Sequence, residues 1–138
     1  MQYFFNQYTS KKYDCIISPG FPIPALKHGE SSVCSAFCAY TFLFNVLDMP
    51  SVVLPVRLVR PGEDVFKDDF YPGDILEIRA QNSTEGSVGL PLGIQVSCLP
   101  YEDEKVCGIA KQLEKIFKFP YLPLERINQY KPDVTAAK

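Results

Sequence analysis

The sequence lacks most of the features by which metal sites, secreted scaffolds and membrane spans are recognised. It contains one histidine, His28, and no Cys-x-x-Cys pair, so a four-ligand zinc site is not expected. Its five cysteines form no regular framework, which argues against a secreted disulfide scaffold and favours an intracellular setting. No run of about 18 apolar residues is present, so we predict no transmembrane segment.

An excess of charge of one sign is also missing. The 14 basic and 16 acidic residues leave a formal charge of −2, without the basic excess typical of nucleic-acid-binding proteins. The first residues, 1–12, contain no arginine and no apolar stretch, so neither a signal peptide nor a transit peptide is predicted. We therefore expect no nucleic-acid partner, no cofactor and no metal, while the compartment and peripheral membrane association stay open.

What is present is the composition of one folded domain. The length is 138 residues, of which 46% are hydrophobic and 22% charged, and these values indicate a packed core rather than disorder. Residues 1–12 suggest the end of a helix. Apolar patterning predicts strands at 15–17, 51–59 and 92–99, and helices at 32–47, 74–80 and 102–117.

Two of these elements indicate that the sheet belongs to something larger. The helix at 32–47 is apolar around most of its circumference, so we expect it to be buried on most sides. The strand at 51–59 is continuously apolar and should be covered on both faces, while Pro55 requires a sheet edge, a bulge or an early end. Long crossovers favour parallel or mixed strands. The fold class is thus α/β, with an incomplete sheet flanked by helices.

Several segments resemble amidase-signature hydrolases. They are residues 13–19, 40–56 and 89–96, which occur in the order of that family with compatible gaps. Residues 71–75 (Tyr-Pro-Gly-Asp-Ile) and 87–91 (Ser-Val-Gly-Leu-Pro) are similar to the fatty-acid amide hydrolase branch. The resemblance covers residues 13–117. It implies that residues 1–118 form the C-terminal portion of an amidase-signature domain, with residues 119–138 as a tail.

The resemblance does not supply a catalytic residue. Such enzymes cleave amides with a serine nucleophile, a second serine in a cis peptide and a lysine base, all in an upstream Gly/Ser-rich segment that is not matched here. Ser31-Ser32 lacks that glycine-rich setting, and no Gly-x-Ser-x-Gly elbow occurs. The resemblance implies a fragment or split portion of a lipid-amide hydrolase that is inactive alone. The alternative is a non-catalytic structural or accessory subunit derived from an amidase.

The resemblance does imply a substrate-binding wall. In lipid amidases the helix before the Leu-Asp-x-Pro turn lines the acyl-chain pocket, and the stretch after Gly-Asp extends it. The matching positions here are Ser35, Cys38, Phe42, Ile75 and Leu76. The first three lie on one helical face at spacings of three and four. Plain core packing is the alternative. The partners implied are an N-terminal amidase portion or another protein, with an acyl lipid as ligand.

Overall fold

The computed structural model describes residues 2–66 and 73–121, and most of its helices and strands fall close to the expected positions. In chain order they are α1 (Gln2–Ser10), β1 (Ile16–Pro19), the 3-10 helix η1 (Ser35–Cys38), α2 (Ala39–Val46), β2 (Ser51–Leu58), α3 (Ile75–Thr84), β3 (Pro91–Ser97) and α4 (Asp103–Phe117). The stretch 122–138, which contains most of the predicted tail, lies outside the described residues.

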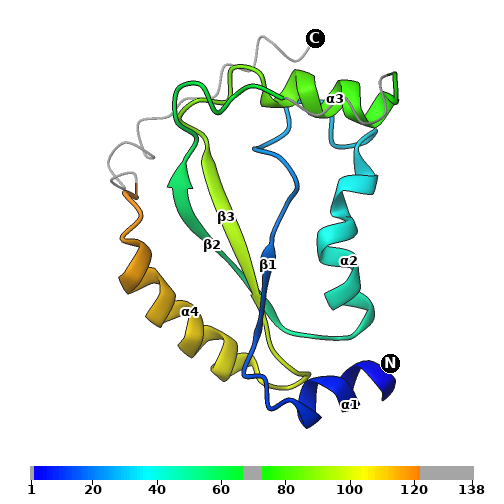
Figure 1. The fold of residues 1–138 in the computed structure, drawn as a ribbon, viewed down its shortest axis with the longest axis vertical. Helices are drawn as coiled ribbons and strands as arrows, with labels where there is room; N and C mark the ends of the chain where they lie inside the picture. Colours follow the sequence, from blue (N-terminus) through cyan, green and yellow to red (C-terminus); the bar gives the residue numbers. More distant parts are fainter. Residues whose placement is uncertain (1, 67–72, 122–138) are drawn as a thin grey trace.

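The three strands form one antiparallel sheet with the order β1-β3-β2 (Figure 1). This corrects the expectation of parallel or mixed strands. The crossover rule holds for β1 and β2, which run in the same direction and are joined through α2. These two strands are not neighbours, however, because β3 inserts between them and runs the opposite way. Both outer strands end the sheet within the described residues, so the incomplete sheet of a partial α/β domain is confirmed.

Strand β2 lies at one edge of the sheet, and Pro55 interrupts its regular pairing with β3. The pairing with β3 shifts register between Pro55 and Arg57, so the edge position and the bulge predicted from Pro55 both occur. The partner of Pro55 is Gly93, where an added Cβ would lie 3.1 Å from the carbonyl oxygen of Leu54. Glycine at position 93 therefore lets the two backbones approach closely beside the bulge.

Helices lie on both sides of the sheet, and each side has its own apolar cluster (Figure 1). The cluster beneath α4 consists of Leu54, Val96, Cys98, Val106 and Ala110, with Cys15, Val52, Ile94, Ile109 and Leu113 around it. The cluster between α1, the end of α2 and the sheet consists of Tyr8, Phe44, Leu47 and Met49, with Phe4, Phe5, Ile16 and Leu99 around it. The sheet thus separates a continuous core under α4 from a smaller one near α1.

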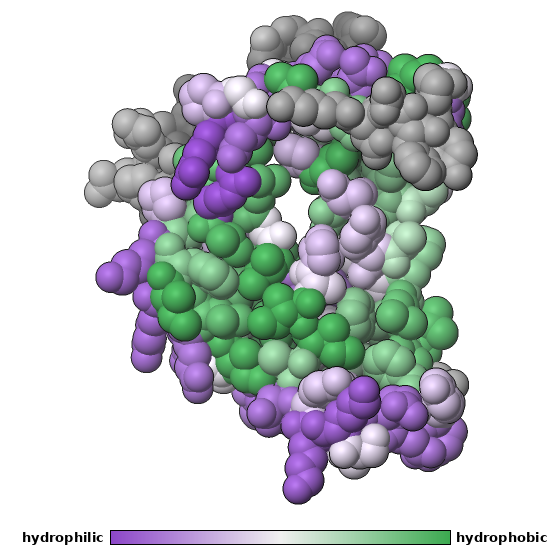
Figure 2. All heavy atoms as spheres, viewed as in Figure 1, coloured by the Kyte–Doolittle hydropathy of each residue, from purple (hydrophilic) through white to green (hydrophobic). Residues whose placement is uncertain are grey.

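Helix α2 is less covered than its sequence suggested. It begins with the 3-10 turn η1, and Phe44 is the one residue of Ala39–Val46 that is buried. Phe42 is 52% exposed and Val46 is 71% exposed. Figure 2 shows apolar residues spread across the middle of the molecule, between polar regions at its ends. The described residues therefore do not bury this helix on most sides. None of the described helices is long and apolar enough to cross a membrane.

Candidate acyl-binding surface

The first part of the predicted wall is the helix formed by η1 and α2. Ser35 and Cys38 lie in η1 and Phe42 lies one turn into α2. The helix is attached to the sheet by Gln95, whose buried side-chain amide donates a hydrogen bond to the carbonyl oxygen of Tyr40 at 3.4 Å. Sequence reasoning missed Gln95. Its signal was a lone amide within the apolar strand at 92–99, since a buried amide needs partners.

The end of α2 fixes the path of the chain into β2. Asp48 takes the left-handed conformation (φ 55°), and its backbone N–H donates to the carbonyl of Asn45 at 3.2 Å. The N–H of Met49 reaches back to the carbonyl of Phe44 at 2.9 Å, which completes a Schellman-type ending. Aspartate tolerates this conformation better than most residues. Asp48 therefore has a conformational role here.

The second part of the wall is the start of α3. The Asp74 carboxylate caps this helix by accepting a hydrogen bond from the backbone N–H of Leu76 at 2.7 Å. That cap places Ile75 and Leu76 in the first turn. Farther along α3, Arg79 forms an ion pair with Glu30, which lies in the loop before η1. The two stretches are thus joined at the end of the molecule where α3 lies (Figure 1).

The five predicted residues differ in how far they are covered. Ser35, Phe42 and Ile75 are exposed, whereas Cys38 and Leu76 are half-buried. None of the five lines the hollow described below. They are not part of either buried cluster, so within the described residues they are not core positions. Their convergence on one acyl chain stays a prediction.

A separate hollow of about 520 Å³ lies between the proline-rich loop and the turn from α3 to β3. Lys27, His28, Ser83 and Ser87 are among its lining residues. The hydroxyls of Ser83 and Ser87 are buried and have no hydrogen-bond partner among the described residues. A serine nucleophile needs a base within hydrogen-bond reach. No such bond joins Ser87 to His28 in residues 2–66 and 73–121.

Among residues 2–66 and 73–121, the serine pair also forms no hydrogen bond to a side chain that could act as a base. Ser31 and Ser32 are exposed, and the Ser32 hydroxyl donates to the carbonyl oxygen of Gly29 at 3.4 Å. That contact is a local turn interaction, and it activates no nucleophile. The part of the chain that the structure describes also contains no cluster of three or more His, Cys, Asp or Glu side chains that could hold a metal ion.

Comparison with known proteins identifies the class to which this fold belongs. The sequence model of the amidase family matches residues 1–107 of this chain. Fatty-acid amide hydrolase 1 of Sus scrofa is 29% identical over 112 residues, covering 80% of this chain and 19% of that protein. Fatty acid amide hydrolase 1 of Caenorhabditis elegans is 32% identical over 102 residues, covering 73% and 18%. An acetamidase of Aspergillus oryzae is 27% identical over 114 residues, covering 81% and 20%.

The chain therefore belongs to the amidase family. This confirms the resemblance seen in its segments, including the similarity to fatty-acid amide hydrolases. The chain spans about a fifth of the length of these relatives.

Proposed function

We propose that this chain works as the C-terminal part of an amidase that hydrolyses fatty-acid amides. In this proposal Ser35, Cys38, Phe42, Ile75 and Leu76 form one wall of the acyl-chain site. The two serines and the lysine that cleave the amide come from sequence outside these 138 residues, and the chain alone is inactive. The names and the coverage of the similar amidases support this division of roles.

The uncovered apolar face of α2 is the observation that carries the proposal. Its exposed residues are Tyr40, Phe42, Leu43 and Val46. The helix contains no charged residue, so water finds no charged group to solvate on this face. Large contiguous apolar patches on soluble proteins usually mark an interface or a ligand site. An acyl chain or the remaining part of an amidase fits such a surface.

The expected contribution to catalysis is binding and orientation. Burying acyl methylene groups yields about 0.8 kcal/mol for each group removed from water. A wall that holds a long chain therefore supplies enough free energy to position the amide at a distant nucleophile. The wall itself needs no charged group, in agreement with the uncharged side chains at these five positions: three hydrocarbon side chains, one hydroxyl and one thiol.

A serine-reactive probe tests this proposal on the native protein. An antibody against α4 precipitates the protein from its source cells, and a fluorophosphonate probe labels active serine hydrolases in the precipitate. We expect a labelled band larger than the 15.6 kDa of this chain. If the antibody also stains that band, the sequence is part of one longer enzyme. If the antibody stains a band of 15.6 kDa instead, the enzyme is assembled from two chains.

Two results would contradict the proposal. Precipitates with no labelled band would favour a non-catalytic accessory subunit. Labelling of the purified 138-residue chain, abolished by Ser31→Ala or Ser32→Ala, would place a nucleophile in this chain after all.

A further inference from the structure

Cys15 and Cys98 face each other at the end of the sheet where β1 begins and β3 ends. The antiparallel register pairs Ile16 with Ser97, so one step outward places Cys15 opposite Cys98. The backbone N–H of Cys98 donates to Pro50 on the β2 side at 3.1 Å, which makes Cys15–Cys98 a non-hydrogen-bonded pair. Such pairs have Cα atoms about 4.5 Å apart, within the range of about 4.4–6.8 Å that a disulfide spans.

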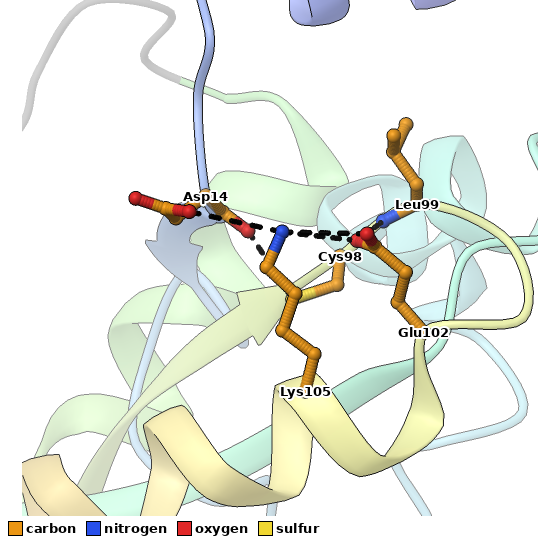
Figure 3. A network of polar contacts seen from close by, with 5 residues as sticks. All are labelled: Asp14, Cys98, Leu99, Glu102 and Lys105. Atoms are coloured by element: carbon orange, nitrogen blue, oxygen red, sulfur yellow. Dashed lines mark hydrogen bonds and ion pairs between the residues drawn. The ribbon is translucent and has the colours of Figure 1, made fainter.

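Both side chains lie on the same face of the sheet, as this register requires. The Cys98 thiol donates a hydrogen bond to the carbonyl oxygen of Asp14 at 3.5 Å, so its sulfur lies against the chain segment that carries Cys15 (Figure 3). Both residues pack into the apolar cluster beneath α4. Both are free thiols, and they differ in access: Cys15 is half-buried and Cys98 is 0% exposed.

We propose that Cys15 and Cys98 form a covalent modification site, a dithiol that small-molecule disulfides such as oxidised glutathione convert into a cross-strand disulfide. The Cys15 thiolate attacks one sulfur of the small molecule, forms a mixed disulfide and releases one thiol. The Cys98 thiol then loses its proton and attacks the Cys15 sulfur, releasing the second thiol. The protein dithiol is oxidised by two electrons and the small disulfide is reduced to two thiols.

The surrounding groups set the rate of this exchange. Burial raises the pKa of both thiols. The Asp14 carboxylate raises both pKa values further and the Glu102 carboxylate raises that of Cys98, so these two charges oppose thiolate formation. The Lys105 ammonium, 3.3 Å from a carboxylate oxygen of Glu102, acts in the opposite direction (Figure 3). We therefore expect slow exchange at neutral pH that accelerates as pH rises.

The disulfide would strengthen the shortest strand. β1 has four residues and pairs with β3 alone among the described strands. A covalent bond at Cys15, directly before its first residue, would hold this edge strand in register and restrict the unfolded chain. The inference depends only on sheet register and side-chain contacts, so it stands or falls independently of the proposed amidase role.

Peptide mapping tests the site on the full chain. The purified protein is incubated with oxidised glutathione in its native state, remaining thiols are alkylated, and trypsin is added. Cleavage after Lys12, Lys27, Arg79 and Lys105 leaves Cys15 in peptide 13–27 and Cys98 in peptide 80–105, each without another cysteine. We expect these two peptides linked, lighter by two hydrogen atoms than their reduced sum, as the main internal disulfide. The same treatment in denaturant should give a mixture of pairs.

Three variants sharpen the result. Cys98→Ser should stop the reaction at a mixed disulfide on Cys15, and Cys15→Ser should leave Cys98 as a free thiol. Cys107→Ser, at an exposed position of α4, should leave the linked peptides unchanged. If replacement of the buried Cys98 unfolds the chain, the half-buried Cys15 still provides the test. Native protein in which Cys15 and Cys98 remain separately alkylated, or pair no more often than in denaturant, would overturn the proposal.

Discussion

The helices on the two faces of the sheet differ in which of their side chains they expose to water. On one face, α4 places Val106 and Ala110 over Val96 and Leu54 and leaves most of its charged residues exposed. On the other face, α2 buries Phe44 and leaves most of its apolar side chains uncovered. An amphipathic helix of the first kind is suited to the boundary between a protein and water. A helix of the second kind is suited to the interior of a larger structure.

This difference agrees with a chain that matches about a fifth of its relatives. The face under α4 resembles the finished outside of a domain, with acidic residues in the first turn and Lys115 in the last. These charges also interact favourably with the helix dipole, because the acidic residues lie at its positive end and Lys115 lies at its negative end. The face around α2 has no such charges. In the proposed function, the rest of an amidase would cover the face around α2, and four changes can break or sharpen this comparison.

The largest expected effect is on association. The isolated chain should form assemblies, because the α2 face remains open to water. The double change Leu43→Lys and Val46→Lys should convert these assemblies to monomer, as measured by light scattering. Ile116→Lys, a matched change at an exposed apolar position of α4, should leave them intact. A monodisperse monomer of the unmodified chain, with cooperative unfolding independent of concentration, would show that the two faces do not differ in this way.

The next effect compares neighbouring residues on opposite faces of β2. Leu54→Ala removes a buried side chain from the cluster under α4 and should lower the free energy of unfolding by about 2–5 kcal/mol. Val53 is 57% exposed on the other face, so Val53→Ala should change it by no more than about 0.5 kcal/mol. Urea unfolding in the double-lysine background measures both. Equal losses would mean that both faces are packed alike.

Alkaline pH probes the small cluster on the α2 side. Burial raises the pKa of the Tyr8 hydroxyl to about 12 from its ordinary value of 10.0. Because the folded state disfavours the tyrosinate, stability is fully present below pH 10 and is lost as pH rises toward 12. The shift corresponds to roughly 3 kcal/mol.

Tyr8→Phe should remove this part of the alkaline loss and leave stability at neutral pH nearly unchanged. The reason is that the Tyr8 hydroxyl has no hydrogen-bond partner among the described residues. The free energy of unfolding, followed against pH in both proteins, checks the expectation. If the two proteins gave the same dependence of unfolding free energy on pH from 9 to 12, the Tyr8 hydroxyl would be exposed to solvent rather than buried.

Local patterns predicted the elements and failed on the arrangement. The apolar stripe of α4 correctly predicted a helix, and Pro55 correctly predicted an irregular edge in β2. Both features depend on residues that are close in sequence. Strand direction depends on which strand inserts between two others, and no local pattern reports that β3 lies beside both β1 and β2. The helix expected at 32–47 begins later in the structure, since the 3-10 turn η1 occupies Ser35–Cys38 before α2. The acyl wall came from family resemblance and from no local signal.

The smallest effect on stability, and the most informative about function, is expected from Phe42→Ala. A buried phenylalanine would cost about 3–5 kcal/mol, but Phe42 is 52% exposed, so the isolated chain should lose at most about 1 kcal/mol. In the complete amidase the same change should raise KM for long-chain amides more than for short-chain amides, because only long chains reach the wall. Tyr3→Ala, at an exposed aromatic position of α1, is the matched control and should leave KM unchanged. A large loss of stability in the isolated chain would make Phe42 a core residue and remove it from the wall.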